Sequence, residues 1–426
     1  MMGVNTRRLV AHFIIGSFIT AGAALAEEGA ANIGSYSWTN IRPTVPFDPV
    51  MWEPRAGLRA LELRNDLYVL GGRGPFSFET GTPIYGDVWK SSDLGMTWSK
   101  TVQWNGGNDQ TMWKPRAYFG AVSHQGRMFV IGGQNFDTQP NPIFPAGCSA
   151  LPPGVPCLPV IPSSTFFADV WSSKDGESWT LETPNAPWEG RAGLSVVVHK
   201  GAIFVLGGSQ GDDASTGGTG RVLFNDVWMS RDGRNWKEVV GRGPKWSPRA
   251  GAAVVSKSGY IYVLGGERGF SCGFDVMSPC QPATRTLYFN DVWRSKGGAN
   301  WELVTASADW SPRPGHQCVV MLNQIVCFGG YGEVPGIPPV AANPTDIWTS
   351  RDGQAWTELM PPAAPPWNGG SPADMKYDFH ALVVSGNRAG QRPSIMTFGG
   401  DRERFGLPDD VNAFLLDNDV WVLSSD

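Results

Sequence analysis

The chain has 426 residues, a formal net charge of −5 and 17% charged side chains, with 54 Gly, 34 Pro and 19 Trp. That much Gly and Pro argues against a helical bundle or a coiled coil, because both residues weaken helices. The many Trp and Phe residues supply a core that a disordered chain lacks, and the acidic balance gives no sign of nucleic-acid binding.

The first 26 residues have the pattern of an export signal. An apolar run, 9–20, follows Arg7 and Arg8, and small residues continue as far as Ala26. This order is typical of a secretory signal peptide, and the run is too short for a comfortable membrane anchor. We therefore expect cleavage after Ala26, a periplasmic or secreted mature chain over 27–426, and no membrane insertion after cleavage.

Six copies of a short motif follow along the mature chain. In each copy an apolar segment ends in Gly-Gly, and an Asp-Val-Trp or Asp-Ile-Trp segment comes after it. The first five copies add another Trp ten or eleven residues after that Asp. Repeats of this size, with four short strands and a Gly-Gly signature, are typical of a β-propeller. The Gly-Gly pairs end at Gly72, Gly133, Gly208, Gly266, Gly330 and Gly400.

The last copy runs out of sequence after its third strand, around Trp421. A matching Trp strand stands at the other end of the mature chain, over 35–41 around Trp38. Pairing of these two segments closes a ring and leaves no open sheet edge. We therefore predict an all-β fold: one six-bladed propeller over 27–426, whose last blade the N-terminal strand completes.

The repeats resemble kelch repeats over essentially the whole mature chain. Pro-Arg-x-Gly opens strand one, Gly-Gly closes strand two, and aromatic residues mark strands three and four. Blade six departs from the pattern, with Tyr377-Asp378-Phe379-His380 where the other blades carry Arg. Six such blades behind a signal peptide look like the periplasmic N-acetylneuraminate epimerase family, whose substrate is an anionic sugar acid. Copper-radical oxidases of the galactose oxidase type also contain kelch blades.

Strand polarity predicts the face that carries function. The connections from strand four to strand one and from strand two to strand three emerge on the same face, and all long segments lie there. Variable loops on a rigid ring are a usual carrier of function. We expect a monomer that holds a carbohydrate or a protein on this face, with long segments at 134–168, 209–225, 267–290 and 401–418.

The six cysteines fit an oxidising compartment and fall in close pairs. Two pairs lie inside single loops, while the third spans a predicted hairpin and is equally compatible with two buried thiols. The spacings do not match a zinc site, so we predict no metal site from them. The expected pairs are Cys148 with Cys157, Cys272 with Cys280, and Cys318 with Cys327.

Three rings of residues are expected near the looped face. Arginines at the start of the inner strands could form a cationic funnel for a carboxylate or sulfate; pairing of each with a nearby Asp or carbonyl is the alternative that we favour. Tryptophans just before strand one either stack on sugars or pack against loops. The residue after each Gly-Gly differs between blades, as an asymmetric pocket requires. The rings are Arg55, Arg116, Arg191, Arg249 and Arg313; Trp52, Trp113, Trp188, Trp246, Trp310 and Trp367; and Arg73, Gln134, Ser209, Glu267, Tyr331 and Asp401.

Catalytic candidates are few. His316 and His380 are expected at equivalent inner-strand positions of adjacent blades. With Asp378, Tyr377 or Glu333, they are candidates for a metal site or an acid–base pair. A structural hydrogen bond to a Gly-Gly carbonyl is the alternative that we favour for both histidines.

The sequence therefore supports three functions in a definite order. A binding or interaction module comes first, and a sugar-acid epimerase or mutarotase comes second. A copper-radical oxidase is a distant third, because its site needs a Tyr crosslinked to Cys and two His, whereas all the Cys pairs here have other expected roles. The sequence identifies no cofactor.

Overall fold

The structure is a computed structural model that describes residues 36–45, 48–75, 82–106, 111–140, 160–210, 222–268, 288–331, 346–359, 376–385, 392–402 and 416–425. All of them belong to one compact unit, Ile33–Asp426. They form strands and no helix, so none of the described residues lies in a helix that could cross a membrane. The predicted signal peptide lies outside them.

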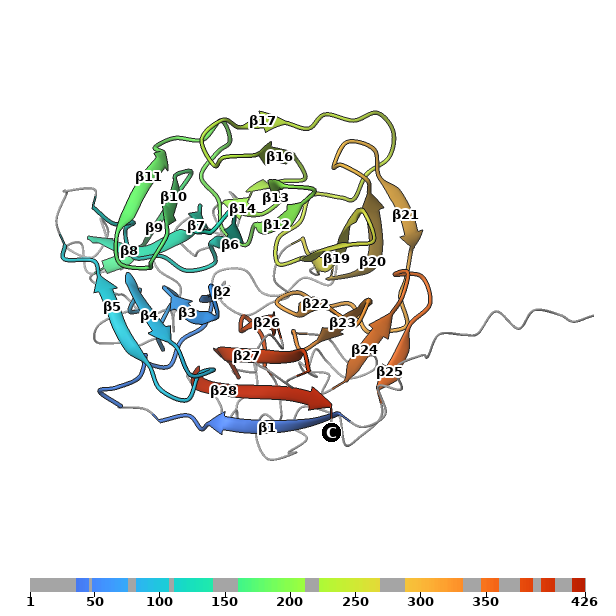
Figure 1. Cartoon of the computed structure of the whole chain (residues 1–426). Helices are drawn as coiled ribbons and strands as arrows, with labels where there is room; N and C mark the ends of the chain where they lie inside the picture. Colours follow the sequence, from blue (N-terminus) through green and yellow to red (C-terminus); the bar gives the residue numbers. More distant parts are fainter. Residues whose placement is uncertain are drawn as a thin grey trace, which may run out of the picture. The chain divides into compact units, whose positions relative to one another are not determined.

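Six four-stranded antiparallel sheets surround a common axis as blades (Figure 1), which confirms the predicted propeller. In every blade the first strand of the repeat is innermost. Blades one to three are β2 (Arg59–Leu63), β3 (Asp66–Leu70), β4 (Asp87–Ser91) and β5 (Ser99–Gln103); β6 (Gly120–His124), β7 (Arg127–Ile131), β10 (Val170–Ser173) and β11 (Trp179–Thr183); and β12 (Ser195–His199), β13 (Ala202–Leu206), β16 (Val227–Ser230) and β17 (Lys237–Glu238).

The other three blades follow the same order until the last. Blades four to six are β18 (Ala253–Lys257), β19 (Tyr260–Glu267), β20 (Tyr288–Ser295) and β21 (Glu302–Thr305); β22 (Gln317–Met321), β23 (Gln324–Phe328), β24 (Ile347–Ser350) and β25 (Thr357–Leu359); and β26 (His380–Val384), β27 (Ser394–Asp401), β28 (Leu416–Ser425) and β1 (Tyr36–Arg42).

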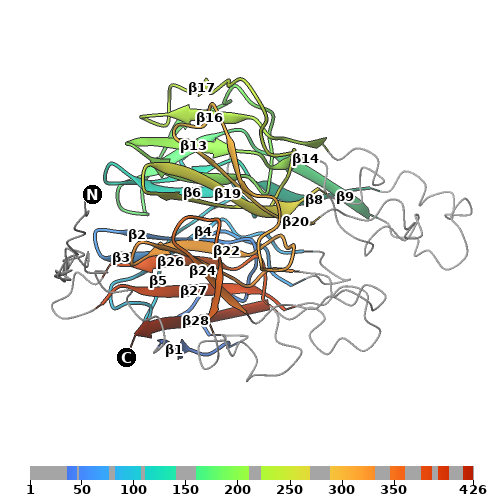
Figure 2. The ribbon, with the colours of Figure 1, turned by 90° about the vertical axis from the view of Figure 1, so that its right-hand side faces the viewer.

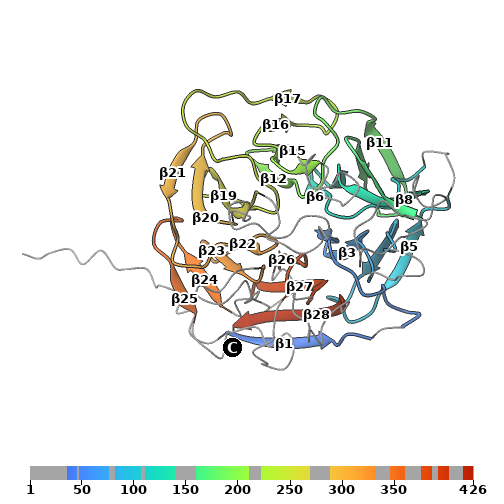
Figure 3. The same ribbon diagram turned by 180° about the vertical axis from the view of Figure 1, so that it is seen from behind.

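The two ends of the described chain meet in blade six. Strand β1 pairs antiparallel with β28, and Trp38 lies opposite Leu423. Seen from behind, β1 runs along the outer edge of β28 (Figure 3). The predicted closure by an N-terminal strand is therefore confirmed, with the strand at 36–42 rather than 35–41.

Two small ribbons extend the blades on one face. Strands β8 (Gln134–Pro140) and β9 (Val160–Phe166) form one ribbon, and β14 (Ser209–Gln210) and β15 (Val222–Leu223) form the other. Both belong to connections between second and third strands, and Figure 2 shows β8, β9 and β14 extending to the same side of the blades. We call this side the looped face.

Buried tryptophans fill the space around the blades. The Trp that precedes the inner strand meets the Trp of the outer strand edge-to-face, as Trp113 and Trp179 do at 5.9 Å and 89°. The five described members of the first set are all buried, so they form core rather than an open stacking surface: Trp52, Trp113, Trp188, Trp246 and Trp310. Trp367 lies outside the described residues.

The Gly-Gly signature joins each blade to the next. The second glycine donates its N–H to the carbonyl of the residue that opens the following blade, as Gly72 does to Arg116 at 2.9 Å. A Cβ on Gly71 would lie 2.8 Å from that carbonyl oxygen, and both glycines have positive φ. Only glycine allows this close approach without strain.

A second set of backbone hydrogen bonds forms a closed ring at the axis. One residue per blade donates its N–H to the equivalent carbonyl of the preceding blade, from 2.8 Å between Gly57 and Asp378 to 3.3 Å between Gly315 and Gly251. All six have φ between 53° and 67°. We call them the axial ring: Gly57, Tyr118, Gly193, Gly251, Gly315 and Asp378.

Candidate functional site at the axis

The five arginines that open the inner strands are buried in ion pairs. Arg55 donates to both carboxylate oxygens of Asp87, at 2.6 and 3.2 Å, and to the Gly71 carbonyl at 3.0 Å. Asp87 also accepts the indole N–H of Trp89 at 2.8 Å, which explains the Asp-x-Trp motif. The same pairs recur as Arg116–Asp169, Arg191–Asp226, Arg249–Asp291 and Arg313–Asp346.

These guanidinium groups have little left to offer a ligand. Each is at most 2% exposed, and four of the five also lie over an aromatic ring, as Arg191 does 3.7 Å from the centre of Phe224. This geometry agrees with the alternative that we favoured from the sequence, in which each arginine pairs with a nearby Asp or carbonyl. We therefore leave the five arginines out of the candidate site.

Blade six uses Lys376 where the other blades use Arg. The Gly330 N–H donates to the Lys376 carbonyl at 2.9 Å, just as Gly72 donates to Arg116. The Nζ atom of Lys376 lies 2.5 Å from a carboxylate oxygen of Asp419 and 3.2 Å from one of Asp417. The alignment that placed the segment beginning at Tyr377 in the Arg position was therefore wrong. Without Pro, Arg and Gly around it, Lys376 carried no repeat signal.

The residues after each Gly-Gly form one tier above the axial ring. Each bridges to the residue that precedes its blade's axial-ring member, as Arg73 does to Ala56; in blade five, Tyr331 N–H donates to the Pro314 carbonyl at 3.0 Å. Their side chains differ, as expected, and only Arg73 is not buried. The other five are Gln134, Ser209, Glu267, Tyr331 and Asp401.

Four polar side chains from three blades meet at the looped end of the axis. Arg73 donates from Nε to the Tyr118 hydroxyl at 2.7 Å and from Nη2 to Asp401. Asp378 lies beside them: burial raises its pKa to about 6, although Arg73, Tyr118 and the nearby Arg59 oppose the shift. We call Arg73, Tyr118, Asp378 and Asp401 the axial cluster.

Two members of this cluster occupy strained backbone positions. Tyr118 and Asp378 have φ of 55° and 53° at axial-ring positions that are glycine in the other four blades. Such conformations cost about 1–3 kcal/mol each and are concentrated at functional sites. The preceding glycines make room for them, because a Cβ on Gly57 would lie 3.0 Å from the Tyr118 ring and one on Gly315 2.8 Å from the Asp378 carboxylate.

A row of tyrosines leads to the axial cluster. The ring of Tyr331 lies 5.9 Å from that of Tyr288 and 5.7 Å from that of Tyr377, edge-to-face in both cases. Tyr377 in turn forms a backbone bridge with Asp401. Aromatic rings therefore border the charged groups on the side of blades four to six; Tyr331 and Tyr377 are buried and Tyr288 is part-buried.

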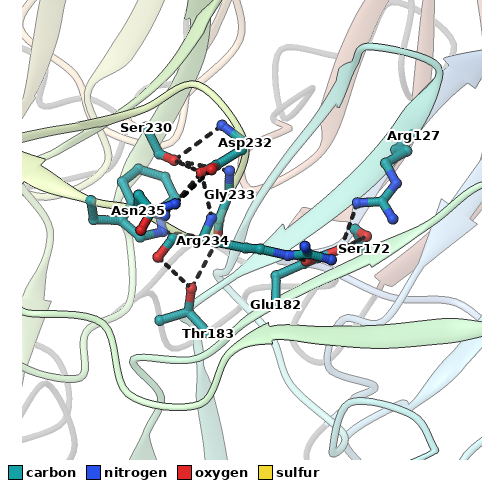
Figure 4. Close-up of polar contacts among 10 residues, drawn as sticks. Arg127, Ser172, Glu182, Thr183, Ser230, Asp232, Gly233, Arg234 and Asn235 are labelled. Carbon is teal, nitrogen blue, oxygen red and sulfur yellow. Dashed lines mark hydrogen bonds and ion pairs between the residues drawn. The ribbon is translucent and has the colours of Figure 1, made fainter.

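A second polar cluster, between blades two and three, is fully satisfied by protein groups (Figure 4). The buried Glu182 carboxylate accepts hydrogen bonds from Arg127 at 2.5 Å, from Ser172 at 2.7 Å and from Arg234 of the next blade. Thr183 adds a hydrogen bond to the Gly233 carbonyl at 2.9 Å. This Glu182 cluster ties two blades together, and its carboxylate is occupied by protein donors.

Comparison with known proteins finds a kelch motif in blade two and a similar fold among solved structures. The Kelch motif family model matches residues 115–142, a segment with Arg116, the β6–β7 hairpin and a Gly-Gly pair. A solved structure titled "Structure of YjhT" is similar over 90% of this chain and 96% of that chain, with a TM-score of 0.56 and 15% sequence identity. At that identity the likeness concerns the fold. The protein is a six-bladed kelch β-propeller.

The two candidate histidines of the kelch propeller do not occupy equivalent positions. His380 pairs across its hairpin with Phe398, as Gln317 does with Phe328, so His316 lies one residue out of register. Successive residues of a strand face opposite sides. His316 therefore packs against Trp310, at 5.5 Å between ring centres, and burial lowers its pKa to about 3. The expected equivalence of the two histidines was wrong.

One of the expected disulfides lies within the described part of the propeller. Cys318 and Cys327 face each other across the β22–β23 hairpin and are bonded. Neither is therefore available for the Tyr–Cys crosslink of a copper-radical oxidase. Cys148, Cys157, Cys272 and Cys280 lie outside the described residues, as does Glu333. Within the described ranges, no group of three His, Cys, Asp or Glu side chains is placed to hold a metal ion.

The structure brings together Arg73, Asp401 and Asp378 from the predicted set. Tyr118, Arg59 and the place of Tyr377 in the tyrosine row were not predicted from the sequence. A signal for Tyr118 was present, because Pro115-Arg116-Ala117-Tyr118 breaks the Pro-Arg-x-Gly pattern at its last position. A departure from a repeat consensus at the axis was the clue.

Proposed function

We propose that this kelch propeller is an exported binding module that holds a carbohydrate at the looped end of its axis. The observation that carries the proposal is the axial cluster, in which four hydrogen-bonding side chains from three blades meet and two of them, Tyr118 and Asp378, stand where the other blades have glycine. Small-molecule sites combine a few placed polar groups with aromatic surface, and in the tyrosine row the part-buried Tyr288 offers such a surface while Tyr331 and Tyr377 are buried beside it. The signal-like residues 1–26 and the Cys318–Cys327 disulfide support export.

A glycan-binding screen with matched tyrosine variants tests this proposal. Tyr118→Phe removes the hydroxyl that accepts from Arg73 and keeps the ring, so we expect affinity to fall about tenfold or more. Tyr260→Phe is the control, because Tyr260 begins β19 at the opposite end of a blade. Absence of any glycan bound by the wild type, or an equal loss in both variants, contradicts a carbohydrate site in the axial cluster.

A sugar-acid mutarotase or epimerase is the second candidate. Opening and reclosing a sugar ring requires a group that both donates and accepts a proton. A carboxyl with a pKa of about 6, next to a tyrosine hydroxyl, suits that task near neutral pH. This candidate also agrees with the resemblance to the N-acetylneuraminate epimerase family.

Mutarotation of N-acetylneuraminate followed by NMR tests the second candidate. We expect the wild type to accelerate the approach to equilibrium and Asp378→Asn to lose most of that acceleration, while the surface variant Glu302→Gln keeps it. A wild-type rate equal to that of buffer excludes the enzyme and leaves the binding module.

A further inference from the structure

Arg59 is a part-buried cation near the axis that has no carboxylate partner. Within the described residues its hydrogen bonding is limited to one bond, from Nη1 to the carbonyl of Leu58 at 3.0 Å, and no Asp or Glu oxygen there lies within ion-pair distance. Burial lowers the pKa of Arg59 to about 10, although Asp378 and Tyr118 oppose the shift. Its charge is therefore only partly compensated, unlike the charges of the five ion-paired arginines.

The residues of the other blades that occupy the strand position of Arg59 offer it almost no hydrogen-bonding partner. The six equivalent residues each pair across a hairpin with the residue that precedes Gly-Gly. Ser195 and Gln317 are already hydrogen-bonded to the carbonyls of Ala252 and His316, at 2.7 and 3.2 Å. Gly120 and Ala253 have no polar side chain. The full set is Arg59, Gly120, Ser195, Ala253, Gln317 and His380.

His380 is the remaining polar member, and it stands in the adjacent blade. Strands β2 and β26 are neighbours at the centre of the ring (Figure 1). Among the described residues, the buried Nδ1 of His380 has no hydrogen-bond partner. Burial, and then the charge of Arg59, lower the pKa of His380 to about 3, so its imidazole is neutral and keeps one N–H. A buried polar atom left unpaired in this way calls for a partner.

We propose that Arg59 and His380 form a binding site for a small carboxylate anion between β2 and β26. A carboxylate accepts two parallel N–H bonds from a guanidinium group, and its charge compensates that of Arg59. One residue separates this level from the axial ring, so the site lies just below Tyr118 and Asp378. The inference is independent of the proposed carbohydrate, because it requires only an anion.

Asp378 competes with the anion for the charge of Arg59. The charged and titratable groups around Asp378 are Arg73, Asp401, Tyr118 and Arg59. When Asp378 is ionised it partly compensates Arg59, and when it is protonated the anion takes over that role. Anion affinity should therefore rise as the pH falls through about 6. In Asp378→Asn, affinity should be high and independent of pH in this range.

Calorimetric titration with sodium formate, at constant ionic strength set by chloride, tests the site. We expect saturable binding to the wild type, binding at least about tenfold weaker in Arg59→Met, and unchanged binding in Arg231→Met. Arg231 is exposed in the turn after β16 and serves as the matched control for loss of one positive charge. Formate should also raise the unfolding temperature of the wild type and leave that of Arg59→Met unchanged.

Three outcomes overturn the proposal. They are no saturable formate binding by the wild type, equal binding by the wild type and Arg59→Met, or an equal loss in Arg231→Met. Because no sugar is present, failure here says nothing against carbohydrate binding. Conversely, a glycan screen without hits leaves the formate result intact.

Discussion

The Glu182 cluster and the axial cluster with Arg59 use similar side chains in opposite ways. Glu182 receives two arginines and a serine, and its carboxylate is fully satisfied across the interface of blades two and three. At the axis, Arg59 lacks an ion pair among the described residues, and two neighbours hold left-handed backbone conformations. The first region stabilises the ring. The second departs from the repeat in ways that stability alone does not favour.

This contrast distinguishes structural from functional charges in a repeat fold. Charges repeated from blade to blade, such as the five Arg–Asp pairs and the pairing of Lys376 with Asp419 in blade six, belong to the scaffold and are balanced within it. Charges present in one blade only, without a balancing partner, are where a ligand can contribute. The following variants test that distinction.

The largest loss in the free energy of unfolding is expected from Arg191→Met. The substitution leaves Asp226 without its bidentate partner and puts an apolar thioether in the place of a fully buried guanidinium group. Removal of one partner from a buried pair costs about 3–5 kcal/mol in the free energy of unfolding, measured by urea denaturation. Arg191→Met with Asp226→Leu should recover part of the loss, because no charge is left unpaired. A loss below about 1 kcal/mol for the single variant would show that the Arg191–Asp226 pair does not stabilise the fold.

A smaller loss is expected from Glu182→Gln. The amide keeps the shape but loses the charge that holds Arg127 and Arg234, so we expect about 1–3 kcal/mol in urea denaturation. Although burial opposes it, Ser172 and Arg234 hold the pKa of Glu182 below its ordinary value of 4.5. The stabilisation is therefore present above about pH 4.5 and is lost as the pH falls through the lower folded-state pKa.

The control for Glu182 is a carboxylate in an exposed pair. Glu302 pairs with Arg294 at 2.9 Å, and its side chain is 60% exposed. Glu302→Gln should therefore cost less than about 1 kcal/mol. Equal losses in the two variants would show that the interface between blades two and three does not depend on Glu182.

The smallest effect has the opposite sign and concerns Asp378→Asn. Since the pKa of Asp378 is raised to about 6 in the folded protein, its ionised form destabilises the fold above that pH. The full shift corresponds to about 3 kcal/mol; because Asp378 is part-buried and water screens part of this cost, we expect the variant to be about 1–2 kcal/mol more stable than the wild type at pH 7.5. That advantage should disappear as the pH falls from about 6 towards the ordinary value of 3.8.

Paired urea denaturation of wild type and Asp378→Asn from pH 4 to pH 7.5 checks this. The difference between the two proteins isolates Asp378 from Asp419, whose pKa burial also raises to about 6. If the variant is less stable than the wild type at pH 7.5, or if the difference in unfolding free energy does not change with pH, then the charge of Asp378 is balanced by its neighbours in the fold.

The repeat architecture could be predicted from the sequence because its signals are local. Gly-Gly and Asp-x-Trp recur in all six blades, and Pro-Arg-x-Gly recurs in whole or in part in the first five. Each reports a backbone conformation or a buried pair. The closure by the strand around Trp38 followed from counting strands. Blade six was misaligned because Lys376 keeps the charge of the motif without its proline or glycine, and the positive φ of Asp378 has no distinctive sequence pattern.

The candidate site was harder to predict because it depends on contacts between blades. Arg73 reaches Asp401 and Tyr118 only when blades one, two and six stand side by side. Arg59 looked like any strand residue, since its lack of an ion pair is a property of its neighbours. The offset between His316 and His380 was hidden by alignment on the Arg position rather than on Gly-Gly, which fixes strand register.

The shared sheet of β1 and β28 has a consequence for synthesis. Of the described strands, β1 is synthesised first and its partner β28 last. The other five blades can therefore form while β1 is still unpaired. The ring can close only after β28 has been made, and this contact joins the two most distant strands of the described chain, so its loop-closure entropy is the largest in the fold. Deletion of residues 420–425 would therefore leave β1 without its hydrogen-bonding partner, although the two strands stand at opposite ends of the described chain.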